Sequence, residues 1–351
     1  MSQLRAAIVG VGRIADMHAP GYLSHPDATI AMICDLDRDL LERRKREWRV
    51  EKTVTDFRAV LDAPDIDLVE IITPHHLHCE MVKQVAAAGK HISVQKPMAL
   101  TVAECDEMID AAKQAGVKLK VFENFVFYPP YRRAKAIVEN GDIGDVLGVR
   151  FRLGSGGGGW YVPLTTWVWR ANRKLCGPGP DLFDDGNHKF SQAIDLLGPI
   201  QEVWGYIDWS LGVIDSPAVI SWNYKEHDAV GAFDAGFMLN MIARGKYYGA
   251  DERIDITGTK GSVVVTRCTA QVHDEPPLWV IKNGRAIGHE DLRSDWMDSF
   301  TDSTHHMIDA LKNDTEPKLT GERGREVLAF SLAAYESAET GKRVRPDEIG
   351  R

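Results

Sequence analysis

Lys96 stands at the end of an apolar run, in Ile92-Ser93-Val94-Gln95-Lys96-Pro97. An ammonium group beside a buried strand is costly unless a partner uses it, and the proline that follows fixes the backbone on one side of it. The sequence therefore predicts an amine held in place at this strand end. Such an amine can polarise a substrate oxygen or share its proton.

A second group of chemically active side chains lies around a stretch rich in glycine and proline. It consists of Trp167-Val168-Trp169-Arg170 and Asp184-Asp185-Gly186-Asn187-His188. Imidazole has an ordinary pKa of about 6.5, so His188 can accept a hydroxyl proton near neutral pH. A nearby carboxylate can orient that base, and an arginine with tryptophans suits a polyhydroxylated ring. The chemistry that these types favour is oxidation of an alcohol, with Lys96, Asp184 and His188 as catalytic candidates.

Each candidate also has an ordinary structural role open to it. His188 can be a satisfied histidine at the start of a helix, Arg170 a surface cation, and Asp185 a helix cap. Lys96 can be a buried stem whose ammonium reaches water. The sequence leaves these readings open, and it disfavours the last of them most.

The segment Gly10-Val11-Gly12-Arg13-Ile14-Ala15 follows the first apolar run and has the pattern GxGxxA. Between a strand and a helix, this pattern predicts a site where a dinucleotide pyrophosphate approaches the backbone at the helix start. Asp35 ends the second predicted strand, 20 residues after Ala15, where a carboxylate takes the ribose 2′-hydroxyl. Because an acid there repels a 2′-phosphate, NAD is favoured over NADP. The alternative is an ordinary strand–helix turn with an exposed aspartate.

The elements that must hold these residues alternate in the first third of the chain. Apolar runs predict strands at 6–9, 29–34, 67–72, 91–94 and 117–121, with helices ending near 24 and lying near 37–48, 76–88 and 101–115. Continuous apolar strands separated by amphipathic helices are typical of a parallel sheet covered on both faces. We predict an α/β Rossmann domain that binds NAD(P) over residues 1–123.

From Asn124 onward the pattern changes. The sequence predicts helices near 131–139, 190–197, 292–312 and 321–340, a strand at 146–153, and alternating strands between 201 and 282. The alternation predicts a large open, mostly antiparallel sheet with one buried face. The glycine-rich residues 154–159 are predicted to be a loop outside regular structure, acting as a mobile lid or a swapped arm. Residues 124–351 are assigned to an α+β domain for substrate binding and oligomerisation.

Composition restricts the partners. The 351 residues carry a net charge of −9, which argues against nucleic acid and anionic membranes because both require basic patches. Five scattered cysteines, without a CxxC pair, indicate free thiols in a reducing compartment. The N-terminal residues lack the pattern of a signal peptide, and no apolar run approaches the roughly 18 residues of a membrane helix. A cytoplasmic location is therefore expected.

Two further patterns concern metals and assembly. His75-His76-Leu77-His78 is similar to a metal cluster, but no carboxylate joins it at ligand spacing, so no metal is expected.

Aromatic residues of the predicted sheet, Trp204, Trp209 and Trp222, indicate a face that a second copy can cover. We expect a homodimer or homotetramer formed through this sheet.

Taken together, the motifs resemble the glucose–fructose oxidoreductase, inositol dehydrogenase and rhizopine-catabolism family (Gfo/Idh/MocA). The matching segments, in order, are GVGRIA at 10–15, ITP at 72–74, AGKHISVQKP at 88–97, WR at 169–170, DDGNH at 184–188, GTKGSV at 258–263 and AAYESA at 333–338. The resemblance covers nearly the whole chain. It implies a Rossmann domain followed by an open-sheet domain, and NAD(P)-dependent oxidation or reduction of sugars, inositols or their derivatives.

The resemblance also implies roles for single residues. Lys96 is similar to the family's active-site lysine, and Asp184 and His188 to its D-x-G-x-H pair, with His188 as acid/base. The candidate cofactor-binding residues are Gly10, Gly12, Arg13, Ile14, Asp35, Thr73, Pro74, His75, His78, Gln95 and Lys96. The candidate substrate-binding residues are Lys96, Asn124, Trp169, Arg170, Asp184 and His188.

Three positions depart from the family pattern. Gln95 stands where the usual motif is Glu-Lys-Pro, so the carboxylate beside the lysine is lost and the hold on the cofactor ribose can change. His75 replaces an asparagine after Thr73-Pro74 and adds an imidazole at the cofactor edge. Ser191 replaces an aspartate three residues after His188.

Three functions stay open on this basis. The first is an NAD-dependent dehydrogenase that transfers hydride between nicotinamide and a hydroxyl or keto carbon of a sugar, cyclitol or glycoside. The second is an NAD-requiring glycosidase or lyase that oxidises its substrate transiently and takes the hydride back after elimination. The third is an NAD-binding sensor without catalysis.

Overall fold

The computed structural model describes residues 3–160, 164–243 and 245–350. The chain forms two compact units: Met1–Asn124 with Phe300–Arg325, and Phe125–Ser299 with Glu326–Arg351. The sequence pattern places all of 124–351 in the second domain, whereas residues 300–325 return to the first unit. Lys120 is one reason, because its fully buried ammonium donates to the carbonyl oxygen of Ser303 at 2.5 Å and to its hydroxyl at 2.8 Å.

Six parallel strands form the sheet of the first unit, in the order β3-β2-β1-β4-β5-β6. They are β1 (Leu4–Val9), β2 (Ala28–Cys34), β3 (Lys52–Val54), β4 (Leu68–Ile71), β5 (His91–Gln95) and β6 (Leu119–Phe122). The sequence predicted five of them and missed the short β3. This is the order of a Rossmann sheet, in which ligands bind beyond the carboxyl ends of the strands. Val9 pairs with both Cys34 and Ile71, so the carboxyl ends of β1, β2 and β4 are level.

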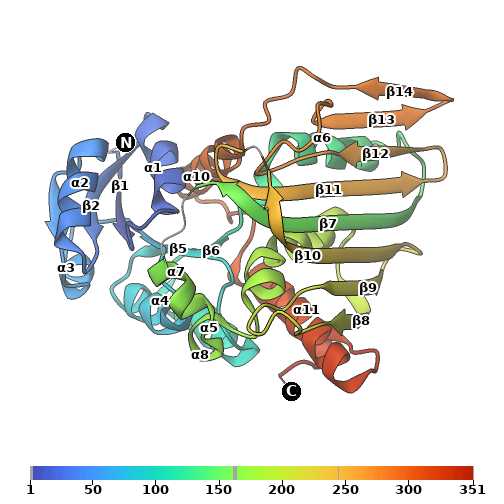
Figure 1. Ribbon diagram of the computed structural model, residues 1–351. Coiled ribbons are helices and arrows are strands. Elements are labelled where there is room, and N and C mark those ends of the chain that lie inside the picture. The colour runs from blue at the N-terminus through green and yellow to red at the C-terminus, as the bar shows by residue number, and fades with distance from the viewer. Residues whose placement is uncertain (1–2, 161–163, 244, 351) are drawn as a thin grey trace. The chain divides into compact units, whose positions relative to one another are not determined.

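Helices cover this sheet, as Figure 1 shows for its two sides. They are α1 (Ala15–Ser24), α2 (Arg38–Trp48), α3 (Arg58–Leu61), α4 (His78–Ala87) and α5 (Val102–Ala115), with the short η1 (His75–Leu77) before α4. Helix α2 begins where the Asp37 carboxylate accepts from the Leu40 N–H, and α5 begins at a capping box of Thr101 and Glu104. Met307 and Ile308 of α10 (Trp296–Lys312) join the core on β1 and β2.

Eight strands form the sheet of the second unit, in the order β14-β13-β12-β11-β7-β10-β9-β8 (Figure 1). They are β7 (Val146–Gly159), β8 (Ile200–Ile207), β9 (Ala218–Tyr224), β10 (Val230–Ile242), β11 (Tyr248–Gly258), β12 (Gly261–Val265), β13 (Leu278–Lys282) and β14 (Arg285–Gly288). Every pair is antiparallel except β7 with β10. Val203, Gly205 and Ile220 are buried while Trp204, Tyr206 and Val219 are exposed, so one face is covered, as predicted.

The helical elements of the second unit are η2 (Phe125–Phe127), α6 (Pro129–Glu139), α7 (Leu164–Arg170), α8 (Arg173–Cys176), η3 (Pro180–Asp185), α9 (Asn187–Leu197), the N-terminal end of α10, which begins in this unit at Trp296, most of α11 (Gly321–Thr340) and η4 (Pro346–Glu348). Four of these helices, α6, α9, α10 and α11, fall near the predicted positions, and the other helical elements were not predicted. Helix α9 starts three residues earlier than expected. The turn η3 is π-helical and carries Asp184.

The prediction of a loop at residues 154–159 is wrong, because β7 continues through Gly159. Gly154 pairs with Gly236 and Asp251, and Gly157 pairs with Ile242. A Cβ at Gly158 would lie 2.3 Å from the Ala243 carbonyl oxygen, and one at Gly159 would lie 1.5 Å from that of Tyr247. The glycines thus let neighbouring backbone approach closely, which is the other meaning of glycine in a strand.

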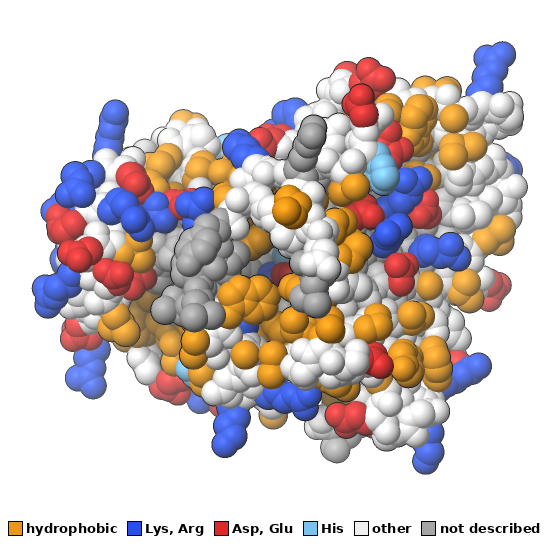
Figure 2. All heavy atoms as spheres, viewed as in Figure 1, with side chains coloured by type: hydrophobic (Ala, Val, Ile, Leu, Met, Phe, Trp, Pro, Cys, Tyr) orange, Lys and Arg blue, Asp and Glu red, His pale blue; other side chains and the backbone are white. Residues whose placement is uncertain are grey.

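The face drawn in Figure 2 shows no sorting of charge by sign. In Figure 2, basic and acidic side chains are interspersed over the face shown, with apolar side chains between them. Within the described ranges, no helix is long and apolar enough to cross a bilayer.

Candidate functional site

The glycine turn after β1 has the geometry that a dinucleotide requires. Gly10 has φ +87°, and a Cβ there would lie 2.4 Å from the Ile72 carbonyl oxygen, so only glycine fits. At Gly12 a Cβ would meet nothing within 4 Å, which leaves open space in front of the exposed backbone. Arg13 and Ile14 complete the turn, and α1 begins at Ala15. These residues fit a pyrophosphate placed against the first turn of α1.

Asp35 follows β2 directly and is half-buried beside this turn. Its Oδ2 accepts from the Val11 N–H at 2.8 Å, and its Oδ1 accepts from the Asp37 N–H at 3.0 Å. The carboxylate is therefore fixed between the glycine turn and the start of α2. This is the position from which an acid can bind the 2′-hydroxyl of an adenosine ribose.

His78 ties two loops at the carboxyl edge of the sheet. Its Nε2 lies 2.9 Å from the carbonyl oxygen of Thr73, and its Nδ1 lies 3.0 Å from that of Pro97. Burial lowers the pKa of this imidazole, and the carbonyl oxygens around it oppose that shift. His78 is thus a brace between the loops after β4 and β5.

Lys96 lies one residue beyond β5, and only 9% of it is exposed. Its N–H donates to Oε1 of Gln95 at 2.8 Å, so the Gln95 side chain folds back onto the turn. Pro74 is half-buried and His75 is buried, at the start of η1. The strand register brings Gly10, Asp35, Thr73 and Lys96 to the same edge of one sheet, as the sequence predicted.

In the second unit, Asp184 and Arg170 form an ion pair. Nε of Arg170 donates to Oδ2 of Asp184 at 2.8 Å, and Asp184 is almost fully buried. The guanidinium also lies over the ring of Trp169, 4.5 Å from its centroid. Arg170 is therefore a held cation with a quarter of its side chain exposed, and the reading as a plain surface cation is wrong.

His188 sits in the first turn of α9 and is held by an aromatic neighbour. Its ring stacks on Phe125, with 3.9 Å between centroids and 19° between planes. On Phe125 in turn lies the ammonium of Lys189, which pairs with Glu252 at 2.6 Å. Both charged groups are buried, and Glu252 also accepts from the N–H and hydroxyl of Thr269. This stack fixes the plane of the imidazole.

The segment that carries Asp184 is anchored by an aspartate that the sequence analysis missed. Asp215 accepts from the N–H groups of Asp181 and Leu182, both at 2.8 Å, and from the Tyr335 hydroxyl. It therefore caps η3 from a loop more than 30 residues away. No local motif marks Asp215, Phe125 or Glu252, because each acts through a contact distant in sequence.

Two other predictions have a structural outcome. Asp185 is exposed, and the residue that caps α9 is Gly186, so Asp185 is not the helix cap. Asn124 is buried directly after β6, in Glu123-Asn124. Among the residues that the structure describes, no three His, Cys, Asp or Glu side chains are grouped to hold a metal ion.

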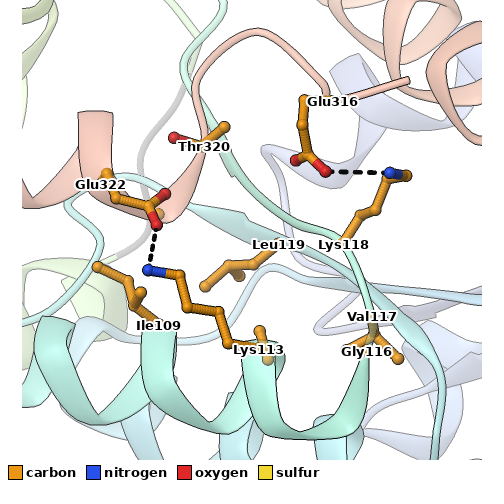
Figure 3. Close-up of a pocket in the computed structure, with 11 residues that line it drawn as sticks. Ile109, Lys113, Gly116, Val117, Lys118, Leu119, Glu316, Thr320 and Glu322 are labelled. Carbon is orange, nitrogen blue, oxygen red and sulfur yellow. Dashed lines mark hydrogen bonds and ion pairs between the residues drawn. The ribbon is translucent and has the colours of Figure 1, made fainter. Parts of the chain in front are cut away.

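One groove of the first unit lies away from these residues. It has a volume of about 420 Å³ and runs between α5, the start of β6 and the start of α11. Figure 3 shows the ion pairs Lys113–Glu322 and Lys118–Glu316 along its walls, at 2.8 and 3.0 Å. Because it opens at the amino end of β6, it is at the opposite edge of the sheet from Lys96 and is not the dinucleotide site.

Comparison with known proteins agrees with this geometry. Residues 4–123 match the model of the oxidoreductase family with an NAD-binding Rossmann fold, and residues 131–264 match the GFO/IDH/MocA C-terminal domain. Myo-inositol 2-dehydrogenase of Thermotoga maritima is 27% identical over 360 residues, covering 99% of each chain. Scyllo-inositol 2-dehydrogenase (NAD(+)) of Bacillus subtilis is 26% identical over 356 residues, covering 98% of this chain and 97% of the relative.

A solved structure supports the fold over the whole length. An oxidoreductase from Agrobacterium radiobacter, in complex with NAD+, L-tartaric acid and magnesium, superposes with a TM-score of 0.86 at 23% identity, covering 99% of each chain. The two family models each match part of one unit and together cover residues 4–123 and 131–264. The chain belongs to the Gfo/Idh/MocA family of oxidoreductases, with NAD as the cofactor of its Rossmann domain.

Proposed function

We propose that this protein is an NAD+-dependent dehydrogenase that oxidises a secondary alcohol of a cyclitol, or of a related sugar or glycoside. The observation that carries the proposal is the set held by η3 and α9: a buried imidazole at His188, and, four residues earlier, the buried carboxylate of Asp184 in its ion pair with Arg170. The same chain holds Lys96 at the carboxyl edge of an NAD-binding sheet. The substrate class rests on the two inositol dehydrogenases that align over almost the whole chain.

Gly12, Arg13 and Ile14 would hold the cofactor pyrophosphate, and Asp35 would hold the adenosine ribose. Thr73, Pro74, His75, His78 and Gln95 would shape the loops on the nicotinamide side. When bound, NAD+ supplies the carbon that accepts the hydride. NADP is disfavoured because its 2′-phosphate would meet the carboxylate of Asp35.

The protein's own residues would manage the proton and the oxygen. His188 accepts the proton of the substrate hydroxyl, and the ammonium of Lys96 polarises a substrate oxygen by donating a hydrogen bond. Arg170 binds a neighbouring hydroxyl with the N–H groups that do not face Asp184, while Trp169 and Asn124 line the substrate. Asp184 acts by holding Arg170.

The test is a panel of myo-inositol, scyllo-inositol, hexoses and glycosides with NAD+, followed by NADH absorbance. We expect steady NADH formation with a cyclitol and loss of at least about 100-fold in kcat for Lys96→Met. The matched control is Lys113→Met, on the surface of α5, which should leave kcat unchanged. Tight NAD+ binding without NADH from any polyol would overturn the proposal.

Two rival outcomes are recognised by the same panel. Cleavage of a glycoside without net NADH, abolished by Lys96→Met, identifies a transient oxidation followed by elimination. Biological activity that survives Lys96→Met identifies a sensor that binds NAD without catalysis.

We also propose a homodimer or homotetramer formed through the open face of the second sheet. Trp204, Tyr206 and Val219 support this, because they are 43%, 54% and 47% exposed on adjacent strands β8 and β9. Trp222, which the sequence suggested for the same face, is buried against Phe330 and cannot contribute. Sedimentation of wild type and Tyr206→Glu tests the assembly, and an unchanged mass in the variant would count against it.

A cytoplasmic location is proposed on the state of the thiols. In the described part of the chain no disulfide joins the five cysteines, Cys34, Cys79, Cys105, Cys176 and Cys268. Burial raises the pKa of Cys34 and of Cys79 to about 11, which keeps both as unreactive thiols.

A further inference from the structure

We propose that His18 and Glu70 are positioning residues that set the orientation of Lys96 through Gln95. None of the motifs above includes His18 or Glu70. The inference rests on the proposed function, because Lys96 has its role in that reaction. It identifies a line of hydrogen bonds from the interior of the Rossmann sheet to the turn that carries the amine.

The line has four members. Oε1 of Glu70 lies 3.1 Å from Nδ1 of His18, Nε2 of His18 lies 2.9 Å from Nε2 of Gln95, and Oε1 of Gln95 accepts from the Lys96 N–H at 2.8 Å. Glu70 is on β4 and Gln95 on the adjacent strand β5, while His18 comes from α1. His18 and Glu70 have exposures of 0% and 1%, so the line is shielded from water.

Every proton in this line is fixed by its neighbour. The backbone N–H of Lys96 can only donate, so its partner on Gln95 is the carbonyl oxygen, and the Gln95 amide nitrogen faces His18. The amide nitrogen can only donate, so Nε2 of His18 must accept and carries no proton. A neutral imidazole then has its proton on Nδ1, which donates to Glu70.

Glu70 is an acceptor suited to end the line. Besides His18, it accepts from the hydroxyl of Ser93 at 3.1 Å and from the hydroxyl of Tyr22. Burial lowers the pKa of the nearby Lys120 to about 7, and the charge of Glu70 opposes that shift. Three hydrogen-bond donors fix the orientation of the buried Glu70 carboxylate, and the carboxylate in turn orients the His18 imidazole.

Two aromatic rings pack against the imidazole. The centroid of the His18 ring lies 4.0 Å from that of Phe122 and 5.2 Å from that of Phe300. These contacts restrict rotation of the imidazole, which holds Gln95, and Gln95 in turn holds the Lys96 turn. A misplacement of about 1 Å at a reacting group can cost roughly 100-fold in rate, so this chain of contacts matters for the amine.

The first experiment uses the wild-type protein and does not depend on activity. Long-range ¹H–¹⁵N spectra of the full-length protein, labelled at histidine, report which ring nitrogen is protonated, and His18→Gln assigns the signal. We expect Nδ1 protonated and Nε2 unprotonated near neutral pH. A protonated Nε2, or an imidazolium, would overturn the proposal whether or not the enzyme is active.

The second experiment measures the effect on Lys96. Gln95→Leu removes both bonds of the side chain, and we expect kcat to fall roughly 100-fold while KM for NAD+ changes less than about 3-fold. Gln95→Glu keeps the shape of the side chain but replaces the amide donor by a carboxylate oxygen, which requires a donor on His18. The spectrum of this variant should therefore show Nε2 of His18 protonated. A purely structural role would lower the melting temperature of Gln95→Leu and leave kcat per folded molecule unchanged.

A control on the same strand separates these effects. His91 begins β5, at the end away from Lys96, and its Nδ1 accepts from the Lys118 N–H at 3.1 Å. His91→Asn should leave kcat and the His18 spectrum unchanged. If no polyol reduces NAD+, the proposed function fails and so does the role in the reaction, whereas the spectrum still decides whether the hydrogen-bond line exists.

Discussion

The Lys96 region and the His188 region are held in place by different means. Lys96, Gly10, Asp35 and Thr73 lie at the ends of neighbouring parallel strands, and the register of one sheet brings them together. His188 lies on a helix whose support comes from elsewhere in the chain. Its ring stacks on Phe125, which also contacts the Lys189 ammonium, and that ammonium pairs with Glu252. Glu252 lies 64 positions after His188 in the sequence.

The difference shows where a sequence motif is enough to predict the positions of side chains. In a parallel sheet, a motif after each strand is enough to define a site, because every strand ends at the same edge. In the second unit, the DDGNH motif supplies the chemical groups, while buried charges distant in sequence fix their orientation. Variants in the second unit should therefore couple activity to stability more strongly than variants in the first.

The largest effect is expected from His188→Gln. Removal of the proposed base should lower kcat/KM by about 1000-fold, within the usual range for acid–base catalysis, and leave NAD+ binding intact. Steady-state kinetics and NAD+ titration measure the two quantities. His227→Gln, an exposed position in the same unit, is the control. A loss below about 10-fold would remove His188 from catalysis.

Glu252→Gln should test whether a distant charge holds the His188 region. The change leaves the Lys189 ammonium buried without its carboxylate, at a cost of about 3 kcal/mol in the free energy of unfolding. Urea denaturation measures the loss, and Lys189→Met with Glu252→Gln should recover part of it. Equal stability of wild type and Glu252→Gln would mean that the pair does not support this region.

Asp181→Asn should stabilise the second unit in a pH-dependent way. Burial, together with the nearby carboxylates Asp185 and Asp215, raises the pKa of Asp181 to about 7, against the hydrogen bond from Ser155. Between about pH 4 and pH 7, the unfolded chain releases this proton while the folded protein keeps it. The free energy of unfolding of the wild type therefore falls as the pH rises through this range.

The variant cannot ionise, so it should gain about 2 kcal/mol over wild type at pH 8 and nothing at pH 4. Thermal unfolding of both proteins across this range checks the prediction. A gain that is the same at both pH values would show that ionisation of Asp181 is not the cause.

The smallest effect is expected in the first unit, from Asp35→Asn. Asparagine can still accept from the Val11 N–H, so the turn should persist while the charge at the ribose is lost. We expect kcat/KM for NAD+ to fall about 10-fold and the preference over NADP+ to narrow. Kinetics with both cofactors measure this, and an unchanged preference would show that Asp35 does not select between them.

Much of the first unit could be predicted from the sequence. The GxGxxA turn, Asp35 and the turn at Lys96 follow apolar runs, and apolar runs with intervening helices allow few arrangements. The short β3 was missed because three residues carry too little pattern. The return of residues 300–325 was also missed, because the contact between Lys120 and Ser303 joins segments 183 residues apart.

In the second unit, glycine was the residue that misled. A run of glycines at 154–159 has the composition of a loop, yet it forms strand because backbone from β10 and β11 approaches where side chains would stand. A glycine-rich composition is compatible with either a loop or a strand, and the neighbouring strands determine which of the two forms.

The sequence by itself determined the chemical groups and the sheet that presents the cofactor site, since periodicity and turn motifs are local properties. Only the tertiary structure decided which groups are braced and by what. Asp215 under η3, Glu252 behind Phe125, and Glu70 with His18 behind Gln95 are each a buried polar residue. Such a residue is stable only when partners surround it, and those partners come from segments that meet only once the chain has folded.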